Sequence, residues 1–419
     1  MKVQTGRPPQ GVAARSAAVR LLHGVTVLGR PLDQSFGQAA SGLSGPDRAL
    51  ARALVSLSLR NLAGLDQLID SACSRPLPPD ARARQALRIA LTGRLLLDTP
   101  PHAVIATILP LLEGGPRRLV HGVLSTLFRQ DALLPPPAVP EPFATRWREA
   151  WGEEAVEAAG RMLAAVPPTD LCIAKPEDTH RWAEQFGGRS LFPGHVRLAG
   201  SQAVPELTGF ADGSWWVQDI AAQLPARLLG DIRDARVLDL CAAPGGKTMQ
   251  LAAAGAQVTA VDISRRRMQR LTENLERTGL QAETIVADAL TWQPDSPFDA
   301  ILLDAPCSAT GTFRRHPDVL WLKAAMDLAP LVELQQQLLT RAAAWLRPGG
   351  RLVAAVCSLE PEEGEERPAP PGLLDDPISS DELPGSLEPN AVGHVRTLPG
   401  LWEAEGGTDG FHIARYRMR

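Results

Sequence analysis

The chain lacks several features that would place it in a common class of protein. None of its apolar runs approaches the ~20 residues needed to span a membrane, and residues 1–10 lack the apolar core of a signal peptide. Its five cysteines are odd in number and form no Cys-x-x-Cys pair, so neither a disulfide framework nor a structural zinc site is indicated. We therefore expect a cytoplasmic protein with no membrane segment and no metal.

Lysine is scarce, because only 4 of the 43 basic residues are lysines and the other 39 are arginines. Arginine suits two-pronged contacts with phosphate, although the base composition of a gene also produces this bias. Residues 1–140 contain 16 basic and 8 acidic residues, whereas the whole chain has a net charge of −4. A basic first third followed by an acidic remainder points to nucleic acid as a partner of the first part.

The 419 residues are enough for several domains, and the sequence pattern changes along the chain. Residues 1–10 predict a flexible tail, and apolar residues at helical spacing over 11–132 predict an all-helical domain of roughly five to seven helices. The prolines of 133–145 predict a linker. Residues 146–210 predict a small α+β module that begins with one helix over 147–166, and residues 211–419 predict a third, α/β domain.

Arginines of the helical region predict one basic face, with an ordinary solvated surface as the alternative; they are Arg48, Arg52, Arg60, Arg84, Arg88, Arg117 and Arg118. Near the start of the third domain, Trp215 and Trp216 are adjacent. Such a pair can stack on a base, but we favour packing at a domain junction, because tryptophan is a highly buried residue.

The third domain alternates strands and helices in the manner of a doubly wound parallel sheet. The expected strands cover 237–240, 258–261, 283–286, 300–303 and 352–356, and the expected helices cover 248–254, 265–278 and 331–346. The acidic, proline-rich stretch 360–389 predicts a loop. Residues 410–416 predict a strand that closes the sheet at its edge.

Two of the expected strands end in residues suited to covalent chemistry. The run Ile301–Leu303 ends in Asp304, and Pro306, which cannot pair in a sheet, leads to Cys307. The strand 352–356 ends at Cys357. A lone free cysteine is usually a small buried hydrophobic residue. Two cysteines and an acid at adjacent strand ends predict instead a reactive site at the edge where such sheets bind ligands.

A second ligand-binding feature follows the strand 237–240, where the chain turns into a helix. Its glycines let the backbone approach a ligand, and the helix N-terminus favours a carboxylate. Asp262 ends the next strand, where an acid accepts hydrogen bonds from ribose hydroxyls, and Asp288 lies where it can meet an adenine amino group. These groups together describe S-adenosylmethionine; the turn consists of Cys241, Ala242, Ala243, Pro244, Gly245, Gly246 and Lys247.

A nucleotide hydrolase is the competing interpretation of this turn. The triplet Gly246-Lys247-Thr248 matches the end of a P-loop, but the glycine required five positions earlier is Cys241. Asp304 would then serve as the acid that binds magnesium. A dinucleotide fingerprint of the form Gly-x-Gly-x-x-Gly is absent.

Taken together, the motifs resemble the RNA 5-methylcytosine methyltransferases, and within them the bacterial ribosomal RNA enzymes of the RsmB (Sun or Fmu) family. The helical region resembles the NusB-like RNA-binding bundle through residues 47–51, 54–60 and 86–90. The catalytic resemblance is carried by residues 240–248, 304–311, 314–318, 357–363 and 409–411. It implies a multi-domain protein in which a Rossmann-like methyltransferase domain follows the NusB-like bundle and a small α+β module.

The resemblance also implies roles for individual residues. Cys357 would be the nucleophile that adds to C6 of cytosine, Cys307 would assist release, and Asp304 would contact the base and donate a proton. The turn 241–247, Asp262, Asp288 and Asp304 would bind S-adenosylmethionine. We therefore expect a monomeric enzyme that forms 5-methylcytidine in 16S ribosomal RNA. Transfer RNA as the substrate, or a non-catalytic RNA-binding assembly factor, are the alternatives.

The chain departs from the family pattern at three places. Val356 stands where the family usually has threonine, Ala309 replaces a usual glycine, and residues 171–175 lack the family's arginine and asparagine. We expect catalysis to survive these changes, because the two cysteines and the acids are present.

Overall fold

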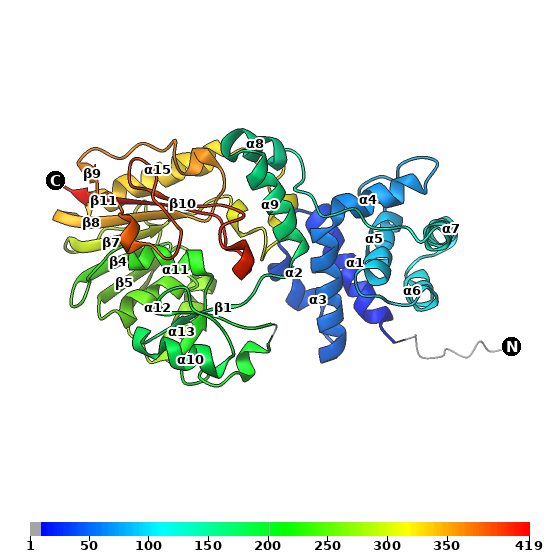
Figure 1. Ribbon diagram of the computed structural model, residues 1–419, viewed down its shortest axis with the longest axis horizontal. Helices are drawn as coiled ribbons and strands as arrows, with labels where there is room; N and C mark the ends of the chain where they lie inside the picture. The colour runs from blue at the N-terminus through cyan, green and yellow to red at the C-terminus, as the bar shows by residue number, and fades with distance from the viewer. Residues whose placement is uncertain (1–9, 201) are drawn as a thin grey trace. The chain divides into compact units, whose positions relative to one another are not determined.

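The computed structural model describes residues 10–200 and 202–419, so the tail predicted for residues 1–10 lies outside the described residues except for Gln10. The chain folds into two compact units (Figure 1). The helical unit contains the chain up to Val166 together with Phe313–Met326, and the catalytic unit contains Pro167–Thr312 and Asp327–Arg419. The finer division predicted from the sequence stays a prediction. No helix in the described ranges is both long and apolar enough to cross a bilayer.

The helical unit contains seven α-helices among residues 12–129, within the range predicted. Eleven consecutive residues, Ala83–Gly93, are buried in the fifth, so this helix is the centre of the bundle. The helices are α1 (Val12–Thr26), α2 (Leu32–Ala39), α3 (Gly45–Arg60), α4 (Leu62–Ser71), α5 (Arg82–Leu95), α6 (Pro101–Ile108) and α7 (Gly114–Arg129).

Three arginines of the predicted basic face are instead buried structural groups. Arg88 donates to both carboxylate oxygens of Asp66, at 2.8 and 2.6 Å. Arg84 pairs with Asp70 and Asp66, and Arg60 donates to the backbone carbonyls of Leu163 and Ala165. For these three the prediction of a basic surface is wrong, because each buried guanidinium is held by a partly buried carboxylate or by backbone carbonyls.

The single helix predicted over 147–166 is two helices, α8 (Phe143–Trp151) and α9 (Glu153–Ala164). Gly152 between them has φ +84°, a left-handed conformation that ends α8 and that glycine adopts without steric cost. Within the linker predicted over 133–145, residues 133–140 form neither helix nor strand, whereas α8 begins at Phe143.

The segment Phe313–Met326, which contains α14 (Val319–Leu322), is part of the helical unit although it follows the cysteine loop in sequence. A carboxylate oxygen of Asp318 accepts a hydrogen bond from the backbone N–H of Leu32 at 3.0 Å. The indole N–H of Trp321 donates to the carbonyl of Leu59 at 2.9 Å. Asp318, the last residue of the family-like motif 314–318, therefore helps to hold this segment within the helical unit.

The catalytic unit is built on an eight-stranded sheet whose main path runs β10-β11-β8-β7-β4-β5-β6. Strands β4 to β8 are parallel, which confirms all five predicted strands and the doubly wound arrangement. The strands are β4 (Arg236–Leu240), β5 (Gln257–Asp262), β6 (Glu283–Val286), β7 (Phe298–Asp304), β8 (Leu346–Val356), β9 (Leu373–Asp375), β10 (Val395–Thr397) and β11 (Phe411–Met418).

The predicted edge position of residues 410–416 is wrong. These residues lie in β11, which pairs with β8 on one side and with β9 and β10 on the other. The loop expected over 360–389 contributes β9, and the chain just after it contributes β10. The two short strands cover the edge that β11 would otherwise leave open, as natural sheets usually require.

Successive side chains of a strand point to opposite faces of the sheet, and each face of this sheet packs against helices. Leu302 of β7 shares a core with Ile220 of α11 (Ile220–Arg227), whereas Leu303 shares a core with Leu339 of α15 (Ala329–Ala344). Two further helices, α12 (Gly246–Ala253) and α13 (Arg265–Thr278), follow β4 and β5 in the chain. Chain order reverses between β4 and β7, and open α/β sheets bind ligands at such a switch point.

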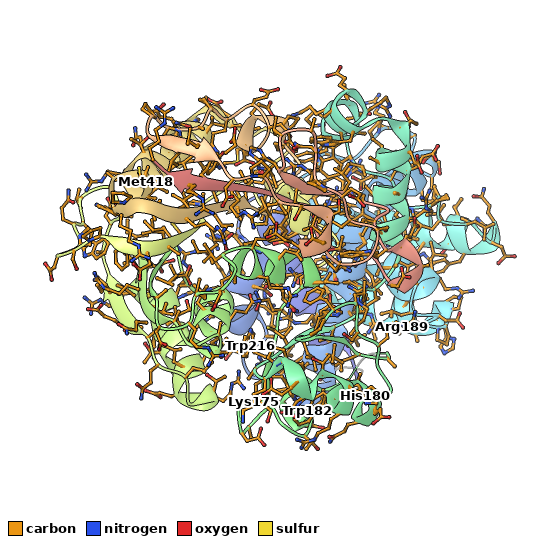
Figure 2. All side chains as sticks on the ribbon, turned by 60° about the vertical axis from the view of Figure 1, so that its left-hand side comes forward. Lys175, His180, Trp182, Arg189, Trp216 and Met418 are labelled. Carbon is orange, nitrogen blue, oxygen red and sulfur yellow. The ribbon has the colours of Figure 1, made fainter. Side chains whose placement is uncertain are left out.

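A small antiparallel sheet of order β2-β1-β3 precedes the large one; β1 and β2 lie within the module predicted over 146–210, and β3 lies beyond its end. Trp216, labelled in Figure 2, and its neighbour Trp215 are buried, which confirms packing rather than base stacking for the pair. Trp182, also labelled there, stacks on Phe186 with ring centroids 5.5 Å apart. The elements are β1 (Asp170–Ile173), α10 (Thr179–Gln185), β2 (His195–Arg197) and β3 (Trp215–Val217).

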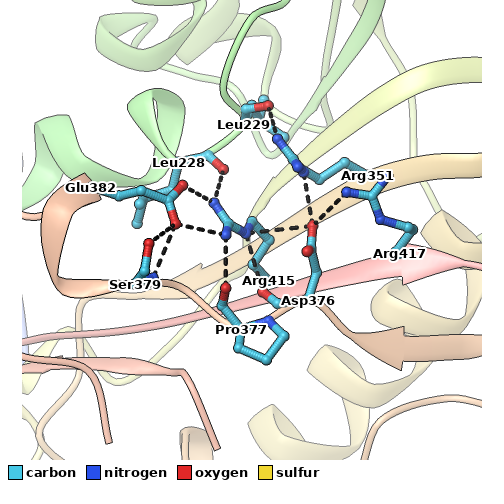
Figure 3. Close-up of polar contacts among 9 residues, drawn as sticks. All are labelled: Leu228, Leu229, Arg351, Asp376, Pro377, Ser379, Glu382, Arg415 and Arg417. Atoms are coloured by element: carbon cyan, nitrogen blue, oxygen red, sulfur yellow. Dashed lines mark hydrogen bonds and ion pairs between the residues drawn. The ribbon is translucent and has the colours of Figure 1, made fainter.

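Ion pairs fasten the irregular segment after β8 to the sheet (Figure 3). Arg415 of β11 contacts Glu382 with two of its nitrogens and donates to the carbonyl of Pro377. Asp376 accepts from Arg351 at 2.9 Å and from Arg417 at 3.3 Å. The segment contains no α-helix, as predicted, yet the pairs fix it in place.

Candidate active site

The two cysteines singled out in the sequence meet at the ends of neighbouring strands. Cys307 follows β7, Cys357 follows β8, and their sulfur atoms lie 3.4 Å apart. The register of the parallel pair sets this distance, because Asp304 at the end of β7 lies opposite Ala355 of β8. Both cysteines are partly exposed, so the pair is accessible rather than enclosed in the core.

The surroundings of Cys307 keep its thiol protonated. The hydrogen bond with Cys357 raises the pKa of Cys307 well above its ordinary value, and burial and the negative charges of Cys357, Glu363 and Asp304 act in the same direction. Cys307 therefore keeps its proton at neutral pH.

Lys247 connects the cofactor turn to the cysteine loop. Its ammonium lies 2.8 Å from a carboxylate oxygen of Asp304 and 5.4 Å above the ring of Phe411. Burial works against the charge, but the adjacent Asp304 carboxylate raises the pKa of Lys247 overall, so it stays cationic. The sequence grouped Lys247 with the cofactor turn and did not show this contact, which arises because β4 and β7 are neighbours.

The turn after β4 has a conformation adapted to a close ligand. Gly245 has φ +104°, and a Cβ there would lie 2.8 Å from Leu271, so only glycine fits. Cys241 also has positive φ, at 59°. Burial raises the pKa of Cys241 to about 12, so it is a neutral lining group and not a third reactive thiol. Ala242 and Ala243 are buried beside it and Pro244 is exposed.

Asp262 and Asp288 lie at the same edge of the sheet, at or just past the ends of β5 and β6. Asp262 is 2% exposed and accepts hydrogen bonds from the N–H groups of Ser264 at 2.8 Å and Ala243 at 3.3 Å. Arg267 also donates to it, at 2.9 Å. Asp288 is exposed and accepts from the N–H of Leu290 at 2.9 Å.

Sequence reasoning missed Ile263 at this edge. It is an apolar side chain that is 65% exposed directly after Asp262. The signal was present, since an isoleucine beyond the end of a strand has no core to enter. The acids, the glycine-lined helix start and this apolar contact together fit a nucleoside that carries a carboxylate, as in S-adenosylmethionine. The described residues contain no group of three or more metal-ligating side chains.

The two units match two different protein families. Residues 226–416 match the family described as 16S rRNA methyltransferase RsmB/F. Residues 12–127 match the NusB family.

Two curated relatives resemble the chain over nearly its whole length. Ribosomal RNA small subunit methyltransferase B of Klebsiella pneumoniae subsp. pneumoniae is 36% identical over 430 residues, which cover 95% of this chain and 97% of the relative. The protein of the same name from Xylella fastidiosa is 35% identical over 426 residues, covering 97% and 98%.

Solved structures support the fold. The crystal structure of PH0851 aligns with 99% of this chain and all of its own, with a TM-score of 0.74 and 23% identity. NSun6 from Pyrococcus horikoshii with SFG aligns with 67% of this chain and 98% of its own, with a TM-score of 0.58 and 19% identity. The chain therefore belongs to the ribosomal RNA small subunit methyltransferase B family of S-adenosylmethionine-dependent methyltransferases.

Proposed function

We propose that this protein methylates C5 of a cytidine in 16S ribosomal RNA through a covalent bond between Cys357 and C6 of the base. The observation that carries the proposal is the pair of sulfur atoms 3.4 Å apart beside Asp304. S-adenosylmethionine, when bound, supplies the methyl group. Family membership supports ribosomal RNA methylation, and the cysteine pair supports cytosine C5 as the atom that is modified.

The first half of the reaction needs a thiolate and a group that stabilises the adduct. C5 of cytosine is a weak nucleophile, and addition of the Cys357 thiolate at C6 makes C5 enamine-like. We assign to Asp304 the contact with N3, where a shared proton stabilises the adduct. Lys247 holds that carboxylate by its 2.8 Å contact.

The second half must restore the aromatic base. The proton on C5 leaves, the electrons of that C–H bond re-form the ring double bond, and the bond between C6 and the Cys357 sulfur breaks. We assign removal of the C5 proton to a water, and to Cys307 the donation of its own proton to the departing Cys357 sulfur, which lies 3.4 Å away. The raised pKa of Cys307 keeps that proton on its thiol until the release step.

We assign the contacts with S-adenosylmethionine to the turn 241–247, Asp262 and Asp288. The ligand carboxylate belongs at the N-terminus of α12. Asp262 takes the ribose hydroxyls, which requires the half-exposed Arg267 to release one of its oxygens. Ile263 packs against the adenine, and Asp288 accepts from its amino group. We propose that the enzyme acts as a monomer in the cytoplasm, where its ribosomal RNA substrate is made.

The test is methylation of defined RNA by the purified chain. Protein, S-adenosylmethionine and 16S ribosomal RNA or transfer RNA are incubated, and bisulfite sequencing reads each cytidine. We expect one cytidine of 16S RNA to resist conversion with the wild type and none with Cys357→Ala. Methylation confined to transfer RNA would contradict the ribosomal target, and methylation at another atom would contradict the covalent chemistry.

A further inference from the structure

A fully buried carboxylate, Glu363, lies beside the two cysteine loops, and the proposed reaction assigns it no role. Glu363 is 0% exposed and ends a short 3-10 turn, Pro361–Glu363, a few residues after Cys357. One carboxylate oxygen accepts from the backbone N–H of Ser308 at 2.9 Å and from the amide of Gln335 at 2.9 Å. The other accepts from the hydroxyls of Ser308 and Ser358, each at 2.5 Å.

Two of these donors are the residues that follow the two cysteines in the chain. Ser308 directly follows Cys307, and Ser358 directly follows Cys357. Gln335 of α15 also donates to the carbonyl of Pro306, at 2.9 Å. One carboxylate is thus tied to the residue after each cysteine and, through Gln335, to the residue before Cys307.

Little regular secondary structure holds the cysteines themselves. Residues 305–309 and 357–360 form neither helix nor strand, although a few backbone hydrogen bonds cross between them, such as Gly311 N–H to Cys357 O at 3.1 Å. A buried charge is costly unless several donors satisfy it, and an apolar side chain would fill the space at lower cost. What the carboxylate adds is a fixed link between two otherwise irregular loops.

We infer that Glu363 is a positioning residue that holds the two cysteine loops together through Ser308 and Ser358, so that both sulfurs face one bound pyrimidine. Its role in turnover rests on the proposed function. In that reaction the sulfurs act one after the other on neighbouring atoms of the same ring. A misplacement of about 1 Å in such an arrangement can cost on the order of a hundredfold in rate.

The positioning itself can be tested without RNA. Diamide oxidises two nearby thiols to a disulfide and is itself reduced to a hydrazine, and the loss of Cys307 and Cys357 thiols is followed by quenched labelling and peptide mass spectrometry. We expect Glu363→Ala to slow formation of the Cys307–Cys357 disulfide about tenfold or more. Glu366→Gln, an exposed change three residues away, is the matched control and should react at the wild-type rate.

In Glu363→Ala, loss of the negative charge and displacement of the loops have opposite effects on the rate of disulfide formation, so the test can tell them apart. The Glu363 charge helps to raise the pKa of Cys307, so removing it should speed thiol oxidation if nothing moved. A slower reaction in Glu363→Ala therefore reports displaced loops. A rate equal to or above that of the wild type would overturn the inference.

Glu363→Gln keeps the shape of the side chain, and the serine hydroxyls can accept from its amide. We expect it to restore the disulfide rate to within about threefold of the wild type, as a positioning role requires. Ser358→Ala removes the hydrogen bond between Glu363 and the Cys357 loop, together with the contacts of the same hydroxyl with Ser308 and Thr310, and leaves the Glu363 charge in place. If Glu363→Ala does not fold, as judged by its melting temperature, a wild-type rate in Ser358→Ala would overturn the inference.

Turnover then separates this inference from the function on which it rests. Methylation of 16S RNA by Glu363→Ala should fall by at least as much as the disulfide rate, with Glu363→Gln largely restored. A wild-type enzyme that methylates no RNA would refute the proposed function while leaving the disulfide result intact. Full turnover in a well-folded Glu363→Ala would refute the role of Glu363 in the reaction.

Discussion

The helical unit and the catalytic unit use their charged residues in different ways. In the helical unit, Arg84 and Arg88 are 4% exposed and neutralise Asp66 and Asp70 inside the bundle. In the catalytic unit, the charges of Asp304 and Lys247 gather at the ends of adjacent strands beside two thiols. A charged residue at a strand end points to chemistry, whereas a charged residue on a helix is as readily a structural partner.

The largest expected effect falls on the cysteines and separates a catalytic cysteine from a structural one. Cys357→Ala should reduce methylation by about a thousandfold or more, since it removes the thiolate that adds to C6 in the proposed reaction. Cys172→Ala is the control, because Cys172 is buried in β1 and burial raises the pKa of its thiol. It should keep activity within a fewfold, measured as methyl incorporation at saturating S-adenosylmethionine. Equal losses of methylation in Cys357→Ala and Cys172→Ala would contradict the assignment of Cys357 as catalytic and Cys172 as structural.

The arginine contrast is tested by stability. Arg88→Ala removes both of its hydrogen bonds to the partly buried Asp66, which keeps its ion pair with Arg84, so we expect a loss of about 2 kcal/mol in unfolding free energy. Arg118→Ala, an exposed change on α7, should alter stability by no more than about 0.5 kcal/mol. Urea denaturation measures both. An unfolding free energy unchanged in Arg88→Ala would contradict the structural role of Arg88 and favour the basic surface predicted from the sequence.

The ion pairs beneath the irregular segment predict a dependence on acid. The hydrogen bond from Arg415 lowers the pKa of Glu382 from 4.5 to about 2. A lowered carboxyl pKa stabilises the fold above the unfolded value, and this contribution is lost as the pH falls from 4.5 towards about 2. The difference in unfolding free energy between the wild type and Glu382→Gln should therefore shrink over that window. A difference independent of pH would show that the pair contributes nothing.

The smallest effect concerns Ala309 in the cysteine loop, where the family usually has glycine. Its φ is +60°, a left-handed conformation that strains any residue with a Cβ. Ala309→Gly should stabilise the protein by about 0.5–1 kcal/mol, because relief of strain outweighs the extra freedom of glycine in the unfolded chain. Thermal unfolding measures the gain. A loss of stability would mean that the loop tolerates the Cβ without strain.

The sequence alone could predict the features that follow from strand order. Apolar runs that end in Asp304 and Cys357 indicate parallel strands, and parallel strands bring their ends to one edge, so the cysteine pair was foreseeable. The turn 241–247 was foreseeable from its glycines. The position of β11 was not, because short strands such as β9 and β10, of three residues each, leave little pattern in the sequence.

Two other features required coordinates for a different reason. The burial of Arg60, Arg84 and Arg88 depends on partners far away in the chain, which composition does not reveal. The same holds for Glu363. It lies in the family-like motif 357–363, but the sequence did not predict its partners. Its four donors come from three separate segments, and only the fold brings Ser308, Gln335 and Ser358 to one carboxylate.

Capture of the covalent intermediate tests the central claim most directly. Cys307→Ala protein is incubated with 16S ribosomal RNA and S-adenosylmethionine, then run on a denaturing gel beside the double variant Cys307→Ala with Cys357→Ala. We predict a denaturant-resistant protein–RNA band in the single variant and none in the double variant. A band that persists without Cys357, or no band while Cys307→Ala still turns over at the wild-type rate, would contradict the division of labour between the two sulfurs.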